Sequence, residues 1–262
     1  MAEKVESNFV MNALLTAGFE AHSLLSFYQK HIEEARNNVK RALALCNNPY
    51  IAFSTGKDSV VMADLVWQIE PSIPAVYFDA DASFPESKEL LKQYKKKGKT
   101  IIEWKTESLL NTMARVGGPR AKESEAATMR STVYKPVKEV VETFAFDCAF
   151  VGVRAGEGIN RKRAVRGNGV LFYSKRDEVF ISWPIAWLTF NDVWAYIVSN
   201  RIDYCTVYDK MFEMGLHWND CRLSYCYGET KATHGRWAIL ARGWPELFNK
   251  FAQRFPEVRE YI

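Results

Sequence analysis

From residue 50 onward, short apolar runs alternate with segments of helical length. The apolar runs are rich in Val, Ile and aromatic residues, and most are continuous; they span 50–53, 75–78, 100–104, 148–153 and 179–183. Continuous runs are typical of strands that are covered on both faces. The segments between them, such as 59–69, 84–97 and 133–144, are long enough to be crossover helices. The pattern therefore predicts a doubly wound, mainly parallel α/β sheet.

The two ends of the chain differ from this pattern. Residues 7–46 carry apolar positions at helical spacing and end at N-N-P, where a helix cannot continue. From residue 237 onward, short helical pieces are separated by W-P and F-P breaks. We expect an N-terminal helical segment at 1–47, a sheet domain at 48–212 and a C-terminal helical extension at 213–262.

Three shorter stretches give local predictions. Residues 122–132 show no clear period, and R-G-N-G at 166–169 predicts a flexible loop. By contrast, T-F-N-D at 189–192 predicts the start of a helix, with Asp192 as the acidic residue of its first turn.

Composition narrows the class of protein. Hydrophobic residues make up 48% and charged residues 25% of the 262 residues, which is typical of a folded globular chain. No stretch approaches the roughly 18 apolar residues of a membrane span, and the first residues do not resemble a secretion signal. We therefore expect a cytoplasmic protein with no membrane partner.

The five cysteines are scattered and odd in number, which favours reduced thiols. A net charge of +4 does not by itself imply nucleic-acid binding.

The stretch S-T-G-K-D-S at 54–59 lies between a predicted strand and a predicted helix. Main-chain N–H groups and the helix dipole favour an anion at such a place. The stretch is not a Walker A loop, because Ile51 stands where that pattern needs glycine and Asp58 stands where it needs Ser or Thr. Taken alone, it is equally consistent with a polar turn in which Asp58 or Ser59 caps a helix.

Several stretches together resemble a known family. The hexapeptide is similar to the S-G-G-x-D-S signature of the PP-loop ATP pyrophosphatases. Three later stretches resemble, in order, the phosphoadenosine phosphosulfate (PAPS) reductase branch of that superfamily: Y-F-D-A-D-A-S-F-P-E-S at 77–87, V-G-V-R-A-G-E-G-I-N-R at 151–161 and W-P-I-A-W-L-T-F-N-D-V-W-A-Y-I at 183–197. The resemblance covers residues 48–212 and implies an adenine nucleotide alpha-hydrolase-like, Rossmann-like fold. The final segment looks like that of reductase-domain proteins of phages and mobile elements.

The resemblance also implies site residues. Those that would bind the nucleotide are Ser54, Thr55, Gly56, Lys57, Asp58, Ser59, Asp79, Asp81, Gly152, Arg154 and Glu157. Those that would act in catalysis are Lys57, Asp58, Arg154 and Arg161. Lys57 would neutralise the phosphates, and Asp58 would orient the loop or approach a Mg²⁺ ion. For Asp79 and Asp81, an alternative is that one of them caps the helix over 83–97.

Thr55 departs from the family pattern, which has glycine at this position. Its Cβ disfavours positive φ, so the loop is strained if residue 55 is left-handed. The basic segment after Arg154 contains Arg161, Lys162, Arg163 and Arg166, and guanidinium groups suit phosphate or sulfate oxygens. A solvated basic loop is the alternative for this segment.

The cysteines of the C-terminal region raise a second possibility. PAPS reductases carry an E-C-G-[IL]-H segment whose cysteine attacks sulfur, but G-L-H at 215–217 here follows Met214. Cys221 or Cys226 could act on sulfur if a neighbour such as Arg222 lowered the thiol pKa. The array His217, Cys221, Cys226 and His234 matches no standard metal spacing, so we expect neither zinc nor an iron-sulfur cluster.

Three hypotheses follow for the function. The first is a PP-loop enzyme that binds ATP, or a nucleotide of the adenylyl-sulfate type, together with Mg²⁺. It would cleave between the α- and β-phosphates and give AMP or an adenylylated intermediate and pyrophosphate. The second is a thiol-dependent sulfonucleotide reductase or sulfur-transfer enzyme. The third is a nucleotide-binding regulator of a protein or nucleic acid, without catalysis. We also expect a homo-oligomer.

Overall fold

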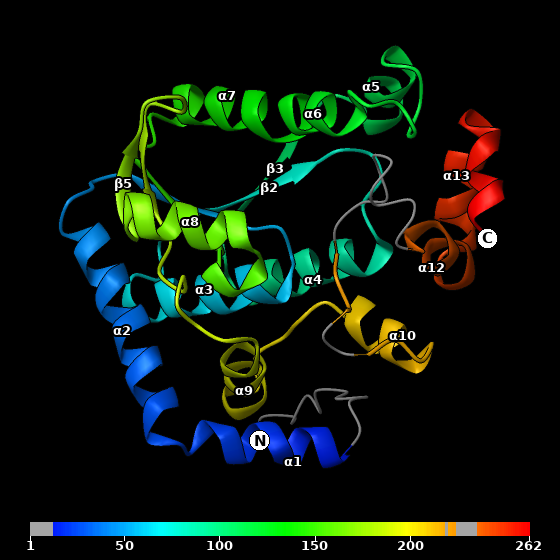
Figure 1. Cartoon of the computed structure of the whole chain (residues 1–262). Coiled ribbons are helices and arrows are strands. Elements are labelled where there is room, and N and C mark those ends of the chain that lie inside the picture. Colours follow the sequence, from blue (N-terminus) through cyan, green and yellow to red (C-terminus); the bar gives the residue numbers. More distant parts are fainter. Residues whose placement is uncertain (1–12, 218–219, 224–234) are drawn as a thin grey trace.

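The computed structural model describes residues 13–217, 220–223 and 235–262, and a six-stranded sheet lies at its centre (Figure 1). The strand order is β3-β2-β1-β4-β6-β5. All neighbours are parallel except β5 and β6, which are antiparallel. The strands are β1 (Pro49–Ala52), β2 (Ala75–Asp79), β3 (Ile101–Lys105), β4 (Cys148–Val151), β5 (Leu171–Ser174) and β6 (Val179–Ser182). The predicted doubly wound, mainly parallel α/β sheet is confirmed.

Helices cover both faces of the sheet, which is why its central strands read as continuous apolar runs (Figure 1). Within β1, Tyr50 packs in one buried cluster and Ile51 in another, because successive side chains point to opposite faces. One face is covered by α2 (Ser26–Leu43), α3 (Lys57–Ile69) and α4 (Pro85–Lys96), and α9 (Phe190–Asn200) packs against α3. Along the other lie α5 (Leu109–Arg115), α6 (Ser124–Met129), the π-helical turn η1 (Arg130–Tyr134) and α7 (Lys135–Phe144).

The N-terminal helices α1 (Ala13–Ser23) and α2 are joined to α9 through one carboxylate. Asp192 is fully buried and forms the predicted capping box, in which its carboxylate accepts from the Thr189 N–H and its own N–H donates to the Thr189 hydroxyl. The ring nitrogens of His22 and His31 also lie 2.7 and 2.9 Å from its two oxygens. Asp192 is therefore the helix N-terminal acid that the sequence predicts.

The remaining elements lie after β4 and toward the C-terminus. They are the 3₁₀ turn η2 (Ala155–Glu157), α8 (Ile159–Asn168), α10 (Val207–Glu213), α12 (Arg236–Gly243), α13 (Pro245–Arg254) and η3 (Pro256–Tyr261). The two predicted breaks, before Pro245 and Pro256, are confirmed because each proline opens a new helix.

One local prediction is wrong, and one strand is missed. Residues 166–168 of the R-G-N-G stretch belong to α8, which continues to Asn168, so a helix stands where a loop was predicted. Only Val165 of this helix is buried, and one apolar position cannot produce a helical period. The sequence reading also omits β5, a half-exposed edge strand that forms a hairpin with β6.

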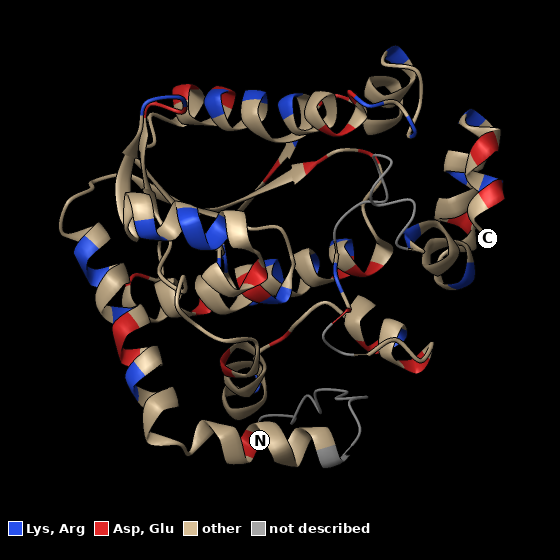
Figure 2. Ribbon diagram, in the orientation of Figure 1, with Lys and Arg blue, Asp and Glu red and all other residues tan. Residues whose placement is uncertain are grey.

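Lys and Arg gather on α8, which carries no acidic residue (Figure 2). In the described part of the chain, no helix is both long enough and apolar enough to cross a bilayer.

Candidate functional site

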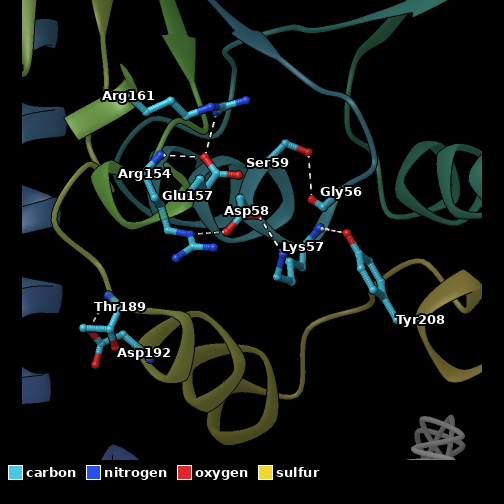
Figure 3. A network of polar contacts seen from close by, with 10 residues as sticks. All are labelled: Gly56, Lys57, Asp58, Ser59, Arg154, Glu157, Arg161, Thr189, Asp192 and Tyr208. Carbon is cyan, nitrogen blue, oxygen red and sulfur yellow. Dashed lines mark hydrogen bonds and ion pairs between the residues drawn. The ribbon is translucent and has the colours of Figure 1, made fainter. Parts of the chain in front are cut away.

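The sheet has its topological switch point between β1 and β4. The chain proceeds from β1 to β2 and β3 on one side, whereas β4 and β6 lie on the other. In open α/β sheets, ligands bind in the crevice outside the carboxyl ends of the strands at this point. The loop at 53–56 follows β1 and the segment at 152–158 follows β4, so both leave the sheet at this edge (Figure 3).

The loop turns into α3 through local hydrogen bonds. The Ser59 hydroxyl donates to the Gly56 carbonyl at 2.9 Å, and the Ser54 hydroxyl donates to Ser59 Oγ at 3.2 Å. Thr55 has φ of 62°, so the strained left-handed conformation expected from the sequence is present. Its hydroxyl lies 2.9 Å from Ser87 Oγ on α4, which ties the strained residue to a neighbouring helix.

Several main-chain N–H groups of this turn donate to no acceptor in the described part of the chain. They belong to Thr55, Gly56, Asp58 and Ser59. The first N–H groups of a helix have no acceptor within that helix, so they are available to water or to a ligand. Together with the start of the 13-residue helix α3, these donors favour an anion.

Two buried cations share one carboxylate beside the loop (Figure 3). Lys57 Nζ lies 3.0 Å from Asp58 Oδ2, and Arg154 Nε donates to Asp58 Oδ1. The Lys57 and Arg154 side chains are only 6% and 5% exposed. Burial alone would raise the pKa of Asp58, but the charges and hydrogen bonds of the two cations outweigh it and hold that pKa below its ordinary value. This group has a net positive charge, which suits phosphate oxygens.

Glu157 connects the Arg154 backbone to α8. One oxygen of its carboxylate accepts from the Arg154 N–H at 3.0 Å and from Arg161 Nη1 at 2.7 Å. The Arg161 side chain is half exposed, so it lies at the rim of the site rather than beside Asp58.

Gly152 allows the two segments to approach each other. A Cβ at this position would lie 2.9 Å from the Ser59 nitrogen and 3.0 Å from the Asp58 carbonyl carbon. These contacts are with backbone, which cannot move aside easily. Gly152 therefore holds the start of α3 against the end of β4, and its predicted contact with a nucleotide stays a prediction.

Asp79 ends β2, Asp81 lies two residues later, and both have protein partners. Asp79 contacts Lys88 Nζ at 2.7 Å and accepts from the Ser83 hydroxyl at 3.1 Å. Asp81 accepts from the Ser108 hydroxyl at 2.6 Å and from the Leu109 N–H at 3.1 Å, so it binds the start of α5. The alternative that Asp81 caps the helix over 83–97 is therefore wrong. The predicted contact of both residues with adenosine stays a prediction.

Cys221 could act on sulfur only if a neighbour lowered the pKa of its thiol, and the structure shows the opposite. The residue is 2% exposed, and burial, followed by the charge of Asp220, raises its pKa to about 11. Lys57 and Arg236 act in the opposite direction but do not prevail. Cys226 and His234 lie outside the described residues. Among the residues that are described, no three His, Cys, Asp or Glu side chains form a group that could hold a metal.

Three aromatic and apolar residues of the site were missed by sequence reasoning. The Phe190 ring lies 5.3 Å from Lys57 Nζ and 6.0 Å from the Arg154 guanidinium. The Tyr208 hydroxyl accepts from the Lys57 N–H at 3.0 Å. Leu223 lies close to Gly56, since a Cβ built on that glycine would be 3.9 Å from Leu223 Cδ1. Phe190 falls in the stretch 183–197 and Tyr208 in the wider region 48–212 that resembles the family, which was the available signal.

A parallel sheet with an anion-binding turn at its switch point defines a class of nucleotide-binding α/β proteins. Residues 48–214 match the family model of the phosphoadenosine phosphosulfate reductase domain. This match spans more than half of the chain, and the chain therefore belongs to that family.

The individual relatives are distant. An adenosine 5'-phosphosulfate reductase of Bacillus mycoides is 25% identical over 190 residues, covering 71% of this chain and 78% of that protein. An uncharacterized protein of Methanocaldococcus jannaschii is 24% identical over 220 residues, covering 81% of this chain but only 50% of its own length. The crystal structure of a PAPS reductase from Candida auris, a phosphate complex, has a TM-score of 0.54 at 14% identity, covering 79% of this chain and 94% of that chain.

Proposed function

We propose that the protein is an enzyme that binds ATP at the turn over residues 54–59 and cleaves it between the α- and β-phosphates. The observation that carries the proposal is the pair of buried cations, Lys57 and Arg154, beside unpaired N–H groups of the turn. Preorganised donors and cations of this kind contribute most where negative charge develops during a reaction.

In the proposed reaction, an acceptor oxygen attacks the α-phosphorus and the bond from that phosphorus to the bridging oxygen breaks. The electron pair of this bond leaves with pyrophosphate, and the adenylyl group is transferred to the acceptor, or released as AMP if the acceptor is water. Any proton on the attacking oxygen is released to solvent. Lys57, Arg154 and the N–H groups of the turn would stabilise the departing charge. Arg161, at the rim, would reach the ligand only by leaving Glu157.

The residues present fit a Mg²⁺ ion that arrives with the nucleotide. Mg²⁺ in nucleotide sites is usually held by one or two carboxylates together with phosphate oxygens and water. Asp58 is the carboxylate beside the turn, and both of its oxygens are engaged by cations. A bound Mg²⁺ would neutralise phosphate charge, and Asp58 would hold it by exchanging one of its ion pairs.

The test is to incubate the protein with ATP and Mg²⁺, with and without candidate acceptors, and to analyse the products by mass spectrometry. AMP or an adenylylated acceptor together with pyrophosphate would support the proposal. ADP and phosphate would contradict it, and tight binding without any turnover would favour the non-catalytic regulator.

A second candidate is a thiol-dependent sulfonucleotide reductase. Relatives named as adenosine 5'-phosphosulfate reductases favour it, as does the position of Leu223, which brings the chain two residues after Cys221 next to the turn. The raised pKa of Cys221 opposes a role for this thiol in its present surroundings. Production of sulfite from PAPS or adenosine 5'-phosphosulfate that is lost when Cys221 and Cys226 are both replaced by serine would support this candidate. Sulfite production that survives the double replacement would dismiss it.

Four further proposals rest on the sequence patterns alone. They are membership of the phage-like group, a cytoplasmic location, a homo-oligomeric state and a protein or nucleic-acid partner.

A further inference from the structure

Tyr208 reaches the anion-binding turn from α10. Its side chain is almost fully buried at 4% exposure, and its hydroxyl oxygen accepts a hydrogen bond from the Lys57 N–H at 3.0 Å (Figure 3). Lys57 is the first residue of α3, so this N–H is one of the donors that a helix start offers to a ligand. The hydroxyl also lies against Gly56, where a Cβ would be 3.6 Å from it.

The hydroxyl has one hydrogen left to donate. A tyrosine hydroxyl both accepts and donates, and no acceptor for the Tyr208 hydrogen is present in the described part of the chain. The Gly56 and Ser54 carbonyls of the turn accept from the Ser59 and Thr55 hydroxyls instead. The Asp58 oxygens are engaged by Lys57 and Arg154. A buried donor without an acceptor is costly, so this hydroxyl favours an acceptor such as a negatively charged oxygen.

We infer that Tyr208 donates a hydrogen bond to a phosphate-type oxyanion held by the turn over residues 54–59. The inference rests on the proposed function and adds a binding residue to that site. Burial, followed by the charge of Asp58, raises the pKa of Tyr208 well above 10. The phenol therefore keeps its hydrogen beside an anion and adds no negative charge to the site.

The surroundings fix the direction of this donor. The Trp194 ring meets the Tyr208 ring edge to face, with centroids 5.5 Å apart, and Lys57 Nζ lies 5.6 Å from the Tyr208 ring. The hydrogen bond received from the Lys57 N–H polarises the hydroxyl and strengthens its own donation. One buried side chain thus links the first N–H of α3 to the ligand.

The test compares the Tyr208→Phe variant with the unchanged protein by calorimetric titration, using inorganic pyrophosphate, ATP and adenosine as probes. The Phe variant keeps the ring, its packing on Trp194 and its contact with Lys57. We expect Kd for pyrophosphate and ATP to rise about tenfold, with no change for adenosine. Tyr173→Phe is the matched control, because Tyr173 is 51% exposed on the edge strand β5, and we expect no change for it.

A second variant separates donation from a purely structural role. Site-specific 3-fluorotyrosine at position 208 makes the hydroxyl a stronger donor and a weaker acceptor. Tighter pyrophosphate binding supports the inference, whereas weaker binding means that the hydroxyl serves only to accept from Lys57 and overturns it. This variant also decides the question if thermal melts show that Tyr208→Phe is unfolded.

The remaining outcomes separate this inference from the proposed function. Equal or tighter binding by a folded Phe variant, while the unchanged protein binds ATP, overturns the role of Tyr208 and leaves the proposed function intact. Binding of neither ATP nor pyrophosphate by the unchanged protein overturns both.

Discussion

The hydroxyl of Thr55 lies 2.9 Å from that of Ser87, and this contact joins the turn over residues 54–59 to α4. Thr55 is fully buried in a left-handed conformation, and its hydroxyl also donates to the Ser54 carbonyl at 2.6 Å. A threonine with positive φ costs about 1–2 kcal/mol relative to a relaxed backbone. The two contacts are the only hydrogen bonds of this hydroxyl in the described part of the chain, and we expect them to offset that cost.

Replacing Thr55 with valine tests this compensation. Thr55→Val keeps the shape and the backbone strain but removes the hydroxyl. We expect a loss of about 1–2 kcal/mol in the free energy of unfolding, measured with guanidinium chloride. Thr206→Val is the control, because Thr206 is exposed and caps α10 without a side-chain bond, and it should change stability by less than about 0.5 kcal/mol. A Thr55 variant as stable as the control would contradict the compensation.

Gly152 offers a second test. In Gly152→Ala the new methyl group would meet the backbone of Asp58 and Ser59 at about 3 Å. We expect α3 to move away from β4, with a loss of about 1–3 kcal/mol in stability and weaker binding of pyrophosphate by calorimetry. Gly167→Ala on α8 is the matched control: nothing lies within 4 Å of the added Cβ, and the change should stabilise the helix by about 0.5–1 kcal/mol. Equal behaviour of the two variants would refute the close contact.

The hydrophobic pattern predicts the sheet and its crossover helices because their buried positions are apolar. It fails at α6 and the π-helical turn η1 because the buried positions there are hydroxyl residues at helical spacing: Ser124, Thr128, Ser131 and Thr132. Such a face has the period of a helix but no apolar stripe, so residues 122–132 show no signal. The edge strand β5 and the basic helix α8 were missed because few of their side chains are buried.

The sequence predicts only those site residues that the family resemblance implies. The turn and Arg154 meet at the switch point as expected, since both follow neighbouring strands. The contacts of Tyr208, Phe190 and Ser87 come from helices distant in sequence, and no local pattern specifies them. The ion pair between Asp58 and Arg154 likewise joins residues that are 96 positions apart in the sequence.

Asp209 makes stability depend on pH in an unusual direction. Burial, opposed in part by the hydrogen bond from Tyr204, raises the pKa of this carboxyl from 3.8 to about 6. The folded protein therefore holds a proton that the unfolded chain has released between these values. The stabilisation is full below about pH 4 and is lost as the pH rises through 6.

The Asp209→Asn variant removes this titration. The free energy of unfolding is measured with guanidinium chloride at several pH values for the variant and the unchanged protein. We expect the value of the variant minus that of the unchanged protein to rise between pH 4.5 and 7.5, by at most roughly 3 kcal/mol. For Glu142→Gln, at an exposed position of α7, this difference in free energy of unfolding should not change with pH. If the difference for Asp209→Asn does not change with pH either, the pKa of Asp209 is ordinary.

Asp58 balances the two buried cations while no nucleotide is bound. Asp58→Asn leaves Lys57 and Arg154 buried without a negative partner, and we expect a loss of about 3–5 kcal/mol in stability at pH 7 in a buffer free of phosphate. Glu107→Gln is the control, since it breaks the exposed Glu107–Arg115 pair and should cost about 1 kcal/mol or less. Because pyrophosphate supplies the missing negative charge, it should raise the melting temperature of Asp58→Asn more than that of the unchanged protein. If pyrophosphate raises both melting temperatures equally, or if Asp58→Asn is as stable as the control, Asp58 does not hold the cations in place for the ligand.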